Sequence, residues 1–137
     1  MKLLITVSNV KNPENKISKL VEPSSDINQI VENIILDSNY YLNIDIGHYY
    51  MDIDLFKKEN LSISTLLVDK SLWLIETNEF GYDMYDSGVF CAYTEEEALS
   101  LGNDKGRGFS ENNSITKIGQ AKKDLPIGEV CLSFNAG

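Results

Sequence analysis

The chain has 137 residues, of which 42% are hydrophobic and 24% are charged, so it is long enough for one globular domain or two very small ones. Its 21 acidic residues outnumber its 12 basic residues and give a net charge of −9. This balance argues against direct binding of nucleic acid, because phosphate contacts need Lys and Arg. No apolar run approaches the roughly 20 residues that cross a membrane. The apolar start of the chain is interrupted at Thr6 and is not followed by a small-residue cleavage site, so it is interpreted as a strand and not as a signal peptide. We therefore expect an intracellular protein, in the cytoplasm of its host cell.

The first third of the chain predicts a strand, a polar turn and an amphipathic helix. Residues 1–8 form the strand, and Asn12-Pro13 marks a turn within the polar stretch 9–19. The segment 23–26 (Pro-Ser-Ser-Asp) supplies a helix start, with a serine cap and an acid in the first turn. The helix is expected to end near residues 37–39. Its apolar positions follow helical spacing: Ile27, Ile30, Val31, Ile34 and Ile35.

A β-hairpin is predicted from residue 40 to residue 55. Apolar and polar residues alternate over 40–46 and again over 50–55, and Gly47-His48 fits a two-residue turn between them. Pairing residue 46 with residue 49 places apolar residues opposite one another on one face. The opposite face of the hairpin would then carry Tyr41, Asn43, Asp45, Tyr50, Asp52 and Asp54.

Further strands are predicted between residue 61 and the end of the sequence. They cover residues 61–68, 72–75, 89–93, 115–121 and 129–134. The unbroken apolar run of residues 72–75 indicates a strand that is covered on both faces. Residues 78–86, between two of these strands, are expected to form a loop rich in aromatic and acidic side chains.

A short helix is predicted directly after residue 93. Thr94-Glu95-Glu96-Glu97 matches a capping box, in which the Thr oxygen accepts the Glu97 amide and Glu97 reaches back to the start of the helix. Gly102 is expected to end this helix at the C′ position. The polar residues 103–113 that follow contain two glycines, Gly106 and Gly108, and are expected to form a mobile loop.

These elements together predict an α+β protein with a mostly antiparallel sheet of about seven or eight strands and two helices. They pack as one domain or as two small subdomains. In the second case, residues 1–70 form a β-α-hairpin-β subdomain and residues 71–137 form a ββαββ subdomain. The closing strand leaves an edge that can pair between copies, so a homo-oligomer is one expectation.

Acidic residues are concentrated in two blocks that contain no Lys or Arg. Seven of them lie between Val21 and Phe56, and eight lie between Ser71 and Asp104. Such a surface suits either simple solubility or attraction to a basic partner, and tyrosines among the acids are typical of binding surfaces. We expect a protein with a basic surface, such as a nucleic-acid-binding host protein, to contact the following residues: Tyr41, Asp45, Tyr50, Asp52, Asp54, Tyr82, Asp83, Tyr85 and Asp86.

The alternative function is the binding or sequestering of a nucleotide-like small molecule. Lys105 and Arg107 are the only bases between Lys70 and Lys117, and Arg grips phosphate while a nearby aromatic ring can stack on a base. The glycine-rich residues 102–108 lack the end of a P-loop, and a surface loop is the simpler interpretation. The residues of this alternative site are Trp73, Tyr85, Lys105, Arg107 and Phe109.

The sequence contains no recognised catalytic pattern. It has one histidine, His48, and its two cysteines, Cys91 and Cys131, sit in predicted strands as small buried hydrophobes would. Asp52 and Asp54 could lie on one strand face as a metal-binding pair, but a solvated acidic face is the preferred interpretation. We therefore predict no metal, no cofactor and no enzymatic activity, and a metal-dependent hydrolase is the third alternative.

The second half of the chain carries a sequence pattern of its own. It consists of Trp73, Tyr85-Asp86, Val89 to Thr94 running into Glu95-Glu96-Glu97-Ala98, Ile118-Gly119 with Ala121, and the closing Ser133-Phe134-Asn135-Ala136-Gly137. In this pattern residues 72–137 resemble small proteins found in phage genomes and in mobile regions of bacterial genomes. Those proteins have no assigned activity, so the resemblance implies a phage or prophage origin and no particular chemistry.

The leading hypothesis is a small acidic binding or inhibitor protein, encoded by a phage or prophage. It would dock its acidic, tyrosine-bearing face on a basic surface of a host protein, as a counter-defence protein could, with carboxylates in the positions that phosphates would take. Because such binding depends on charge, we expect it to weaken as the salt concentration rises.

Overall fold

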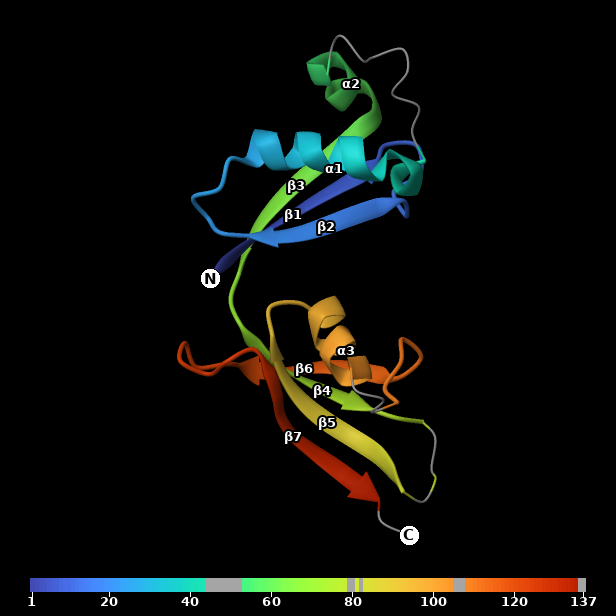
Figure 1. Ribbon diagram of the computed structural model, residues 1–137, viewed down its shortest axis with the longest axis vertical. Coiled ribbons are helices and arrows are strands. Elements are labelled where there is room, and N and C mark those ends of the chain that lie inside the picture. The colour runs from blue at the N-terminus through green and yellow to red at the C-terminus, as the bar shows by residue number, and fades with distance from the viewer. Residues whose placement is uncertain (44–52, 79–80, 82, 105–107, 136–137) are drawn as a thin grey trace. The chain divides into compact units, whose positions relative to one another are not determined.

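The computed structural model of the chain describes all residues except 44–52, 79–80, 82, 105–107 and 136–137 (Figure 1). Within the described part, seven strands form two antiparallel sheets and three helices accompany them, which confirms the predicted α+β class. The prediction had two helices. The chain divides into two compact units, Met1–Leu67 (unit 1) and Val68–Gly137 (unit 2), whereas the sequence placed the division between residues 70 and 71.

Unit 1 consists of a three-stranded sheet with a helix across one face (Figure 1). The strand order is β2-β1-β3, and β1 pairs antiparallel with β2. The polar stretch predicted as a turn therefore also contains a strand, β2, which the sequence analysis missed because three of its six residues are exposed and polar. The elements are β1 (Lys2–Asn9), β2 (Lys16–Val21), α1 (Ile27–Leu42), α2 (Ile53–Asn60) and β3 (Leu61–Val68).

The core of unit 1 joins one face of β1 to the apolar face of α1. The burial of β1 alternates along its whole length, as expected for a strand with one covered face. The predicted isoleucine stripe is buried in this core at three of its five positions, Ile30 packs against the core partly buried, and Phe56 of α2 adds an aromatic ring. The core residues are Leu3, Ile5, Val7, Val31, Ile34, Ile35, Leu42, Phe56 and Leu61.

The prediction of a hairpin over residues 40–55 is wrong in the part that the structure describes. Residues up to Leu42 continue α1 beyond a non-helical residue at Ser38, and α2 begins at Ile53. Leu42 lies seven residues after Ile35, the spacing of two helical turns, and it is fully buried in the core. The alternating pattern was compatible with a strand, but core contacts at helical spacing decide the local structure. The proposed turn at Gly47-His48 lies outside the described residues.

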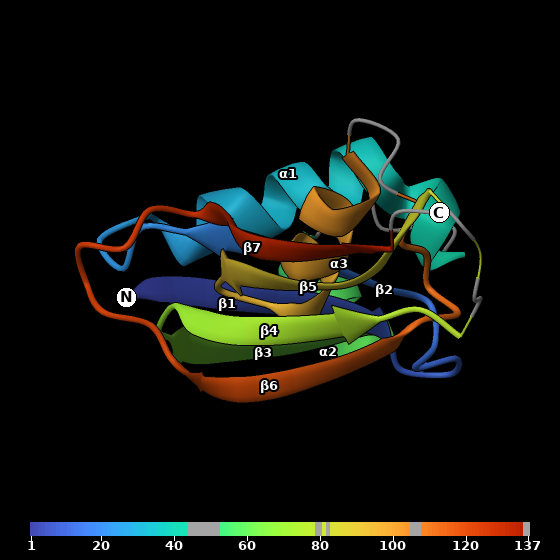
Figure 2. The same cartoon turned by 90° about the horizontal axis from the view of Figure 1, so that it is seen from below.

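Unit 2 consists of a four-stranded antiparallel sheet with α3 on one face (Figures 1 and 2). The strand order is β6-β4-β5-β7, so the two central strands come first in the sequence and the edge strands follow α3. The connection from β6 to β7 passes around one end of the sheet (Figure 2). The elements are β4 (Ser71–Glu76), β5 (Met84–Ala92), α3 (Glu95–Asn103), β6 (Ser114–Gln120) and β7 (Gly128–Asn135).

The core of unit 2 lies between α3 and the sheet. Its buried members are Ile75, Phe90, Ala92, Ala98 and Phe109. Gly102 belongs to this interface, because a Cβ atom at that position would lie 3.0 Å from Ile75 Cδ1 and 3.3 Å from Phe109 Cβ. The prediction that Gly102 ends the helix is therefore wrong: α3 continues to Asn103, and Asp104 is its C-cap.

Candidate functional site

The capping box at the start of α3 forms as predicted. Thr94 Oγ1 accepts a hydrogen bond from the Glu97 amide at 3.1 Å, and Glu97 Oε2 accepts one from the Tyr93 amide at 2.7 Å. One of the three glutamates in the first turn is thus committed to holding the helix end. Glu95 and Glu96 remain exposed, and their charges face solvent at the positive end of the helix dipole.

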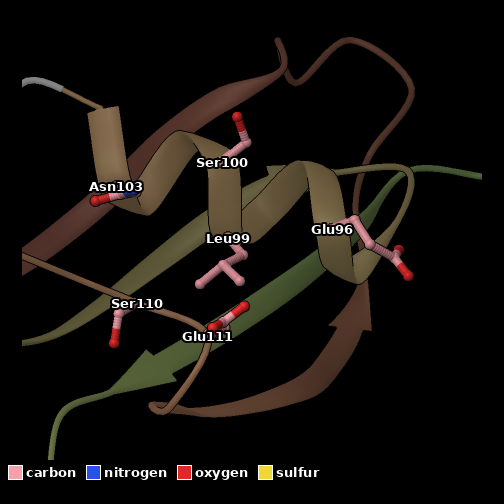
Figure 3. Close-up of a pocket in the computed structure, with 6 residues that line it drawn as sticks. All are labelled: Glu96, Leu99, Ser100, Asn103, Ser110 and Glu111. Carbon is pink, nitrogen blue, oxygen red and sulfur yellow. The ribbon is translucent and has the colours of Figure 1, made fainter. Parts of the chain in front are cut away.

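A groove of about 540 Å³ runs along α3 (Figure 3). One wall comes from α3 and the other from the segment between α3 and β6, so the groove lies within unit 2. In Figure 3 the Leu99 side chain points from the helix toward Glu111. The lining residues are Glu96, Leu99, Ser100, Asn103, Ser110 and Glu111.

The second wall is fixed by the residues around it. Phe109 is buried in the core, where its ring meets Phe90 edge to face with centroids 6.0 Å apart. Ser110 accepts a backbone bond from Asn113 at 3.0 Å, and its amide donates to Asn113 Oδ1 at 2.6 Å. These contacts close a turn over residues 110–113 directly after a core anchor. Glu111 is consequently presented from an ordered turn.

The groove is suited to a cationic group attached to an apolar stem. Glu96 and Glu111 provide two exposed carboxylates, and none of the six lining residues is basic. Ser100, Asn103 and Ser110 add polar groups, while Leu99 offers apolar surface beside Glu111 (Figure 3). An ammonium or guanidinium group would gain charge-assisted hydrogen bonds here, and the methylene groups of Lys or Arg would contact Leu99.

Sequence reasoning named Glu96 only as part of a capping box and missed the other groove residues. A usable signal was present, because residues 96, 99, 100 and 103 follow the i, i+3, i+4, i+7 spacing of one helix face. The second wall carried no such signal. Glu111 and Ser110 come next to α3 only through the burial of Phe109.

The predicted partner-binding segment 82–86 is largely strand rather than loop. β5 begins at Met84, so Tyr85 and Asp86 are both strand residues. The Tyr85 ring packs edge to face on Phe134 of β7 with centroids 5.1 Å apart and also contacts the core, so part of its surface is structural. Asp86 Oδ1 accepts from Ser87 Oγ at 3.2 Å. Asp83 is exposed, and Tyr82 lies outside the described residues.

Asn135 holds the turn before β5 against β7. Its carbonyl accepts from the Asp83 amide at 2.7 Å, and its side-chain amide donates to the Gly81 carbonyl at 3.1 Å. Asp83 has φ 59°, a left-handed conformation that Asp tolerates better than most residues. These two hydrogen bonds with Asn135 therefore hold the turn against β7.

The partner-binding residues predicted in the N-terminal half do not form the expected hairpin face. Tyr41 lies in α1 and Asp54 in the first turn of α2, where its carboxylate is exposed. Asp45, Tyr50 and Asp52 lie outside the described residues. A strand pairing of Tyr41 with Asp54 is excluded, because both residues are helical.

The alternative ligand site loses one of its three aromatic surfaces, that of Phe109, while Trp73 and Tyr85 remain partly exposed. Phe109 is 1% exposed, so its ring has no free face for stacking on a base. Trp73 lies on β4, packs against the core, and donates from Nε1 to the Ala92 carbonyl at 3.1 Å. Lys105 and Arg107 lie outside the described residues. The stacking role expected of Phe109 is therefore wrong, since the ring fills the core instead.

The connection between β4 and β5 and the connection between α3 and β6 meet at one end of the unit 2 sheet. Glu76 pairs with Ser114, and Asn78 Nδ2 donates to the Asn112 carbonyl at 3.4 Å. The groove uses the second of these connections, through Ser110 and Glu111.

The two cysteines differ in environment. Cys91 is fully buried, whereas Cys131 on β7 is exposed, which corrects the expectation that both are buried. Burial raises the pKa of the Cys91 thiol; the positive charge of Lys70 opposes this effect and the negative charge of Glu97 adds to it. Lys70 also donates to the backbone carbonyls of Lys123 (2.6 Å) and Leu125, which fastens the connection between β6 and β7.

Within the described residues, no three His, Cys, Asp or Glu side chains are grouped closely enough to hold a metal ion. No helix in the same part of the chain is both long and apolar enough to cross a membrane. Comparison of the sequence with protein-family models gives no match, and comparisons with curated proteins and with solved structures give none either.

Proposed function

We propose that the protein is a small acidic binding protein that docks unit 2 on a basic surface of another protein. The observation that carries the proposal is the groove along α3, whose described lining holds the carboxylates of Glu96 and Glu111 and the apolar side chain of Leu99 but no basic residue. A Lys or Arg side chain of the partner would insert there, with its charge attracted by the two carboxylates and its stem on Leu99.

The charge of unit 2 supports this proposal beyond the groove. Residues 68–137 contain twelve acidic and six basic residues, a difference of −6, whereas residues 1–67 contain nine and six, a difference of −3. A basic partner would be attracted over distances up to the Debye length, which speeds association at low salt. Exposed Glu95 and Asp83 contribute to the same field without lining the groove.

The biological setting is part of the proposal. The resemblance of residues 72–137 to phage and mobile-element proteins supports a phage or prophage gene whose product acts in the host cytoplasm. A host protein that binds nucleic acid presents the required basic surface, and the carboxylates of the groove would occupy positions that phosphates otherwise take. Occlusion of that surface would inhibit the host protein, and no catalytic step is needed.

The test is retention of bacterial proteins on the immobilised chain at about 50 mM and about 300 mM salt, which shortens the Debye length to well below 10 Å. The groove variant E96Q/E111Q removes two charges without changing side-chain size. The control E14Q/D37N removes two exposed charges from unit 1. We expect basic proteins to be retained by the natural chain and by the control at low salt, and to be lost with the groove variant. Equal retention by the groove variant, or retention indifferent to salt, would refute the proposal.

A further inference from the structure

Among the described strands of unit 2, none pairs with the outer edge of β7. In unit 2, β7 pairs with β5 on one side and ends the strand order β6-β4-β5-β7 on the other. The carbonyl of Asn135 accepts from the Asp83 amide at 2.7 Å, so the backbone groups of residue 135 point toward β5. Successive residues of an antiparallel strand direct these groups to alternate sides. The backbone groups of Leu132 and Phe134 therefore point outward.

The same strand is unusually apolar for an exposed edge. Residues 130–134 (Val-Cys-Leu-Ser-Phe) contain no charge, although about a quarter of the chain is charged. Val130 is 45% exposed and Phe134 is 50% exposed. Natural edge strands usually carry charges or Pro that block further pairing, and this segment has neither.

We infer that residues 130–134 pair antiparallel with the same residues of a second copy, about a two-fold axis at Leu132. In this register Val130 faces Phe134 of the other copy at both ends, and Leu132 faces Leu132. Each half-exposed apolar side chain is then covered by the other, and aromatic–β-branched pairs of this kind stabilise antiparallel sheets.

The charges of β7 favour a second copy as the occupant. The only charged residue of the strand, Glu129, would face the uncharged Asn135 of the other copy, so no two carboxylates oppose each other. The register shift between Val89 and Phe90 leaves Val130 as an extra residue opposite β5 and breaks the regular pairing before that point. A second shift, between Tyr85 and Ser87, leaves Asp86 as an extra residue on β5 opposite Ser133 and Phe134. Residues 131–134 still pair with β5 without an extra residue on β7, and the self-complementary segment adds the bulged Val130 to them. In this dimer the unit 2 sheets of the two copies form one continuous sheet across the two-fold axis.

Sedimentation velocity of the full chain over a range of concentrations tests this surface. We expect a reversible dimer that tightens as salt rises from about 50 to about 500 mM, because two copies of net charge −9 repel each other less when screened. Val130→Lys should raise the dimer Kd by at least about tenfold. The control Ile118→Lys, at an equally exposed site on the other edge strand β6, should leave the Kd within about twofold.

Disulfide trapping tests the register independently of the Kd. Cys131 lies directly opposite Ser133 of the second copy, so S133C should give an SDS-stable dimer under mild oxidation, and adding Cys131→Ser should abolish it. A chain that stays monomeric up to about 1 mM at every salt concentration would overturn the inference. So would an equal effect of Ile118→Lys, or a failure of S133C to cross-link while the dimer forms.

Discussion

Replacement of Asn9 by Ala should destabilise unit 1 more than any exposed substitution of the same kind. Asn9 ends β1, is 5% exposed, and joins two elements that are distant in the sequence. Its side-chain amide donates to the carbonyls of Leu42 (2.9 Å) and Asn43 (3.2 Å) at the end of α1. Its Oδ1 accepts from the amides of Lys11 (2.8 Å) and Asn12 (3.3 Å). One side chain thus caps a helix end and closes a turn.

The size of the effect follows from these four bonds. A neutral intramolecular hydrogen bond contributes about 1 kcal/mol net, and a buried group left without a partner costs about 1–3 kcal/mol. Counting the two short bonds fully and the two long ones partly, Asn9→Ala should cost roughly 2–4 kcal/mol. The last carbonyls of α1 then lose their protein partner, because they have no further helical amide to accept from.

Hydrogen exchange measured by mass spectrometry on the full chain can assign this loss to unit 1. Tryptophan fluorescence cannot, since Trp73 is the only tryptophan and belongs to unit 2. Peptides from β1 and α1 should exchange roughly 30- to 800-fold faster in Asn9→Ala, the factor that corresponds to roughly 2–4 kcal/mol, while β4 and β5 peptides keep their rates. The control Asn33→Ala alters an exposed residue of α1 and should change exchange by less than about twofold. Unchanged protection of β1 in Asn9→Ala would refute the reasoning.

Further substitutions in unit 2 test its packing and its one perturbed thiol. Gly88→Ala should lower stability by about 1–3 kcal/mol in urea unfolding, because its Cβ would lie 2.8 Å from the buried Phe90 ring; Gly119→Ala has no atom within 4 Å of its Cβ and should be neutral. Thr94→Ala removes the α3 cap and should cost about 1 kcal/mol by the same measurement, whereas a smaller loss than in Gly119→Ala would contradict the capping role. Burial raises the pKa of Cys91 in the folded state, so the unfolded chain releases this proton at a lower pH than the folded chain does. Stability should therefore fall as the pH rises above the ordinary thiol pKa, and Cys91→Ser should make that fall less steep. An unchanged slope in Cys91→Ser would show that other groups cause the fall.

Secondary structure could be predicted from the sequence where the interactions that determine it are made between residues close together in the chain. The capping box at Thr94 formed as predicted, because its donors and acceptors lie within four residues. The strands around Trp73 and Phe90 were also predicted from their apolar runs. The expectation that residues 72–75 are covered on both faces is wrong for the described part of unit 2, because α3 covers one face of the sheet and residues 72–74 stay partly exposed. The antiparallel α+β class followed from the same patterns.

Prediction failed where a residue's partner lies far away in the sequence. The alternation over residues 40–55 suited a hairpin, but Leu42 and Phe56 contact a core built from β1 and α1, and that burial requires helices. Gly102 suited a helix end by its lack of a side chain, yet the reason for its small size is the approach of Ile75 and Phe109. The helical spacing of Leu42 after Ile35 was hidden by the alternating pattern, and the contacts at Gly102 leave no periodic signal in the sequence.

The candidate site shows the same division. The sequence by itself determined that the protein is acidic and that Glu96 lies in the first turn of a capped helix. It also showed that no Lys or Arg lies between Ser71 and Asp104. Only the tertiary structure decided that Glu111 faces that helix, since this requires Phe109 to be buried fifteen or so positions along the chain from the capping residue. It also removed Phe109 from the alternative ligand site, because a ring that fills a core cannot also stack on a ligand. A surface made by two segments depends on which residues the core takes, and core packing is a property of the whole unit.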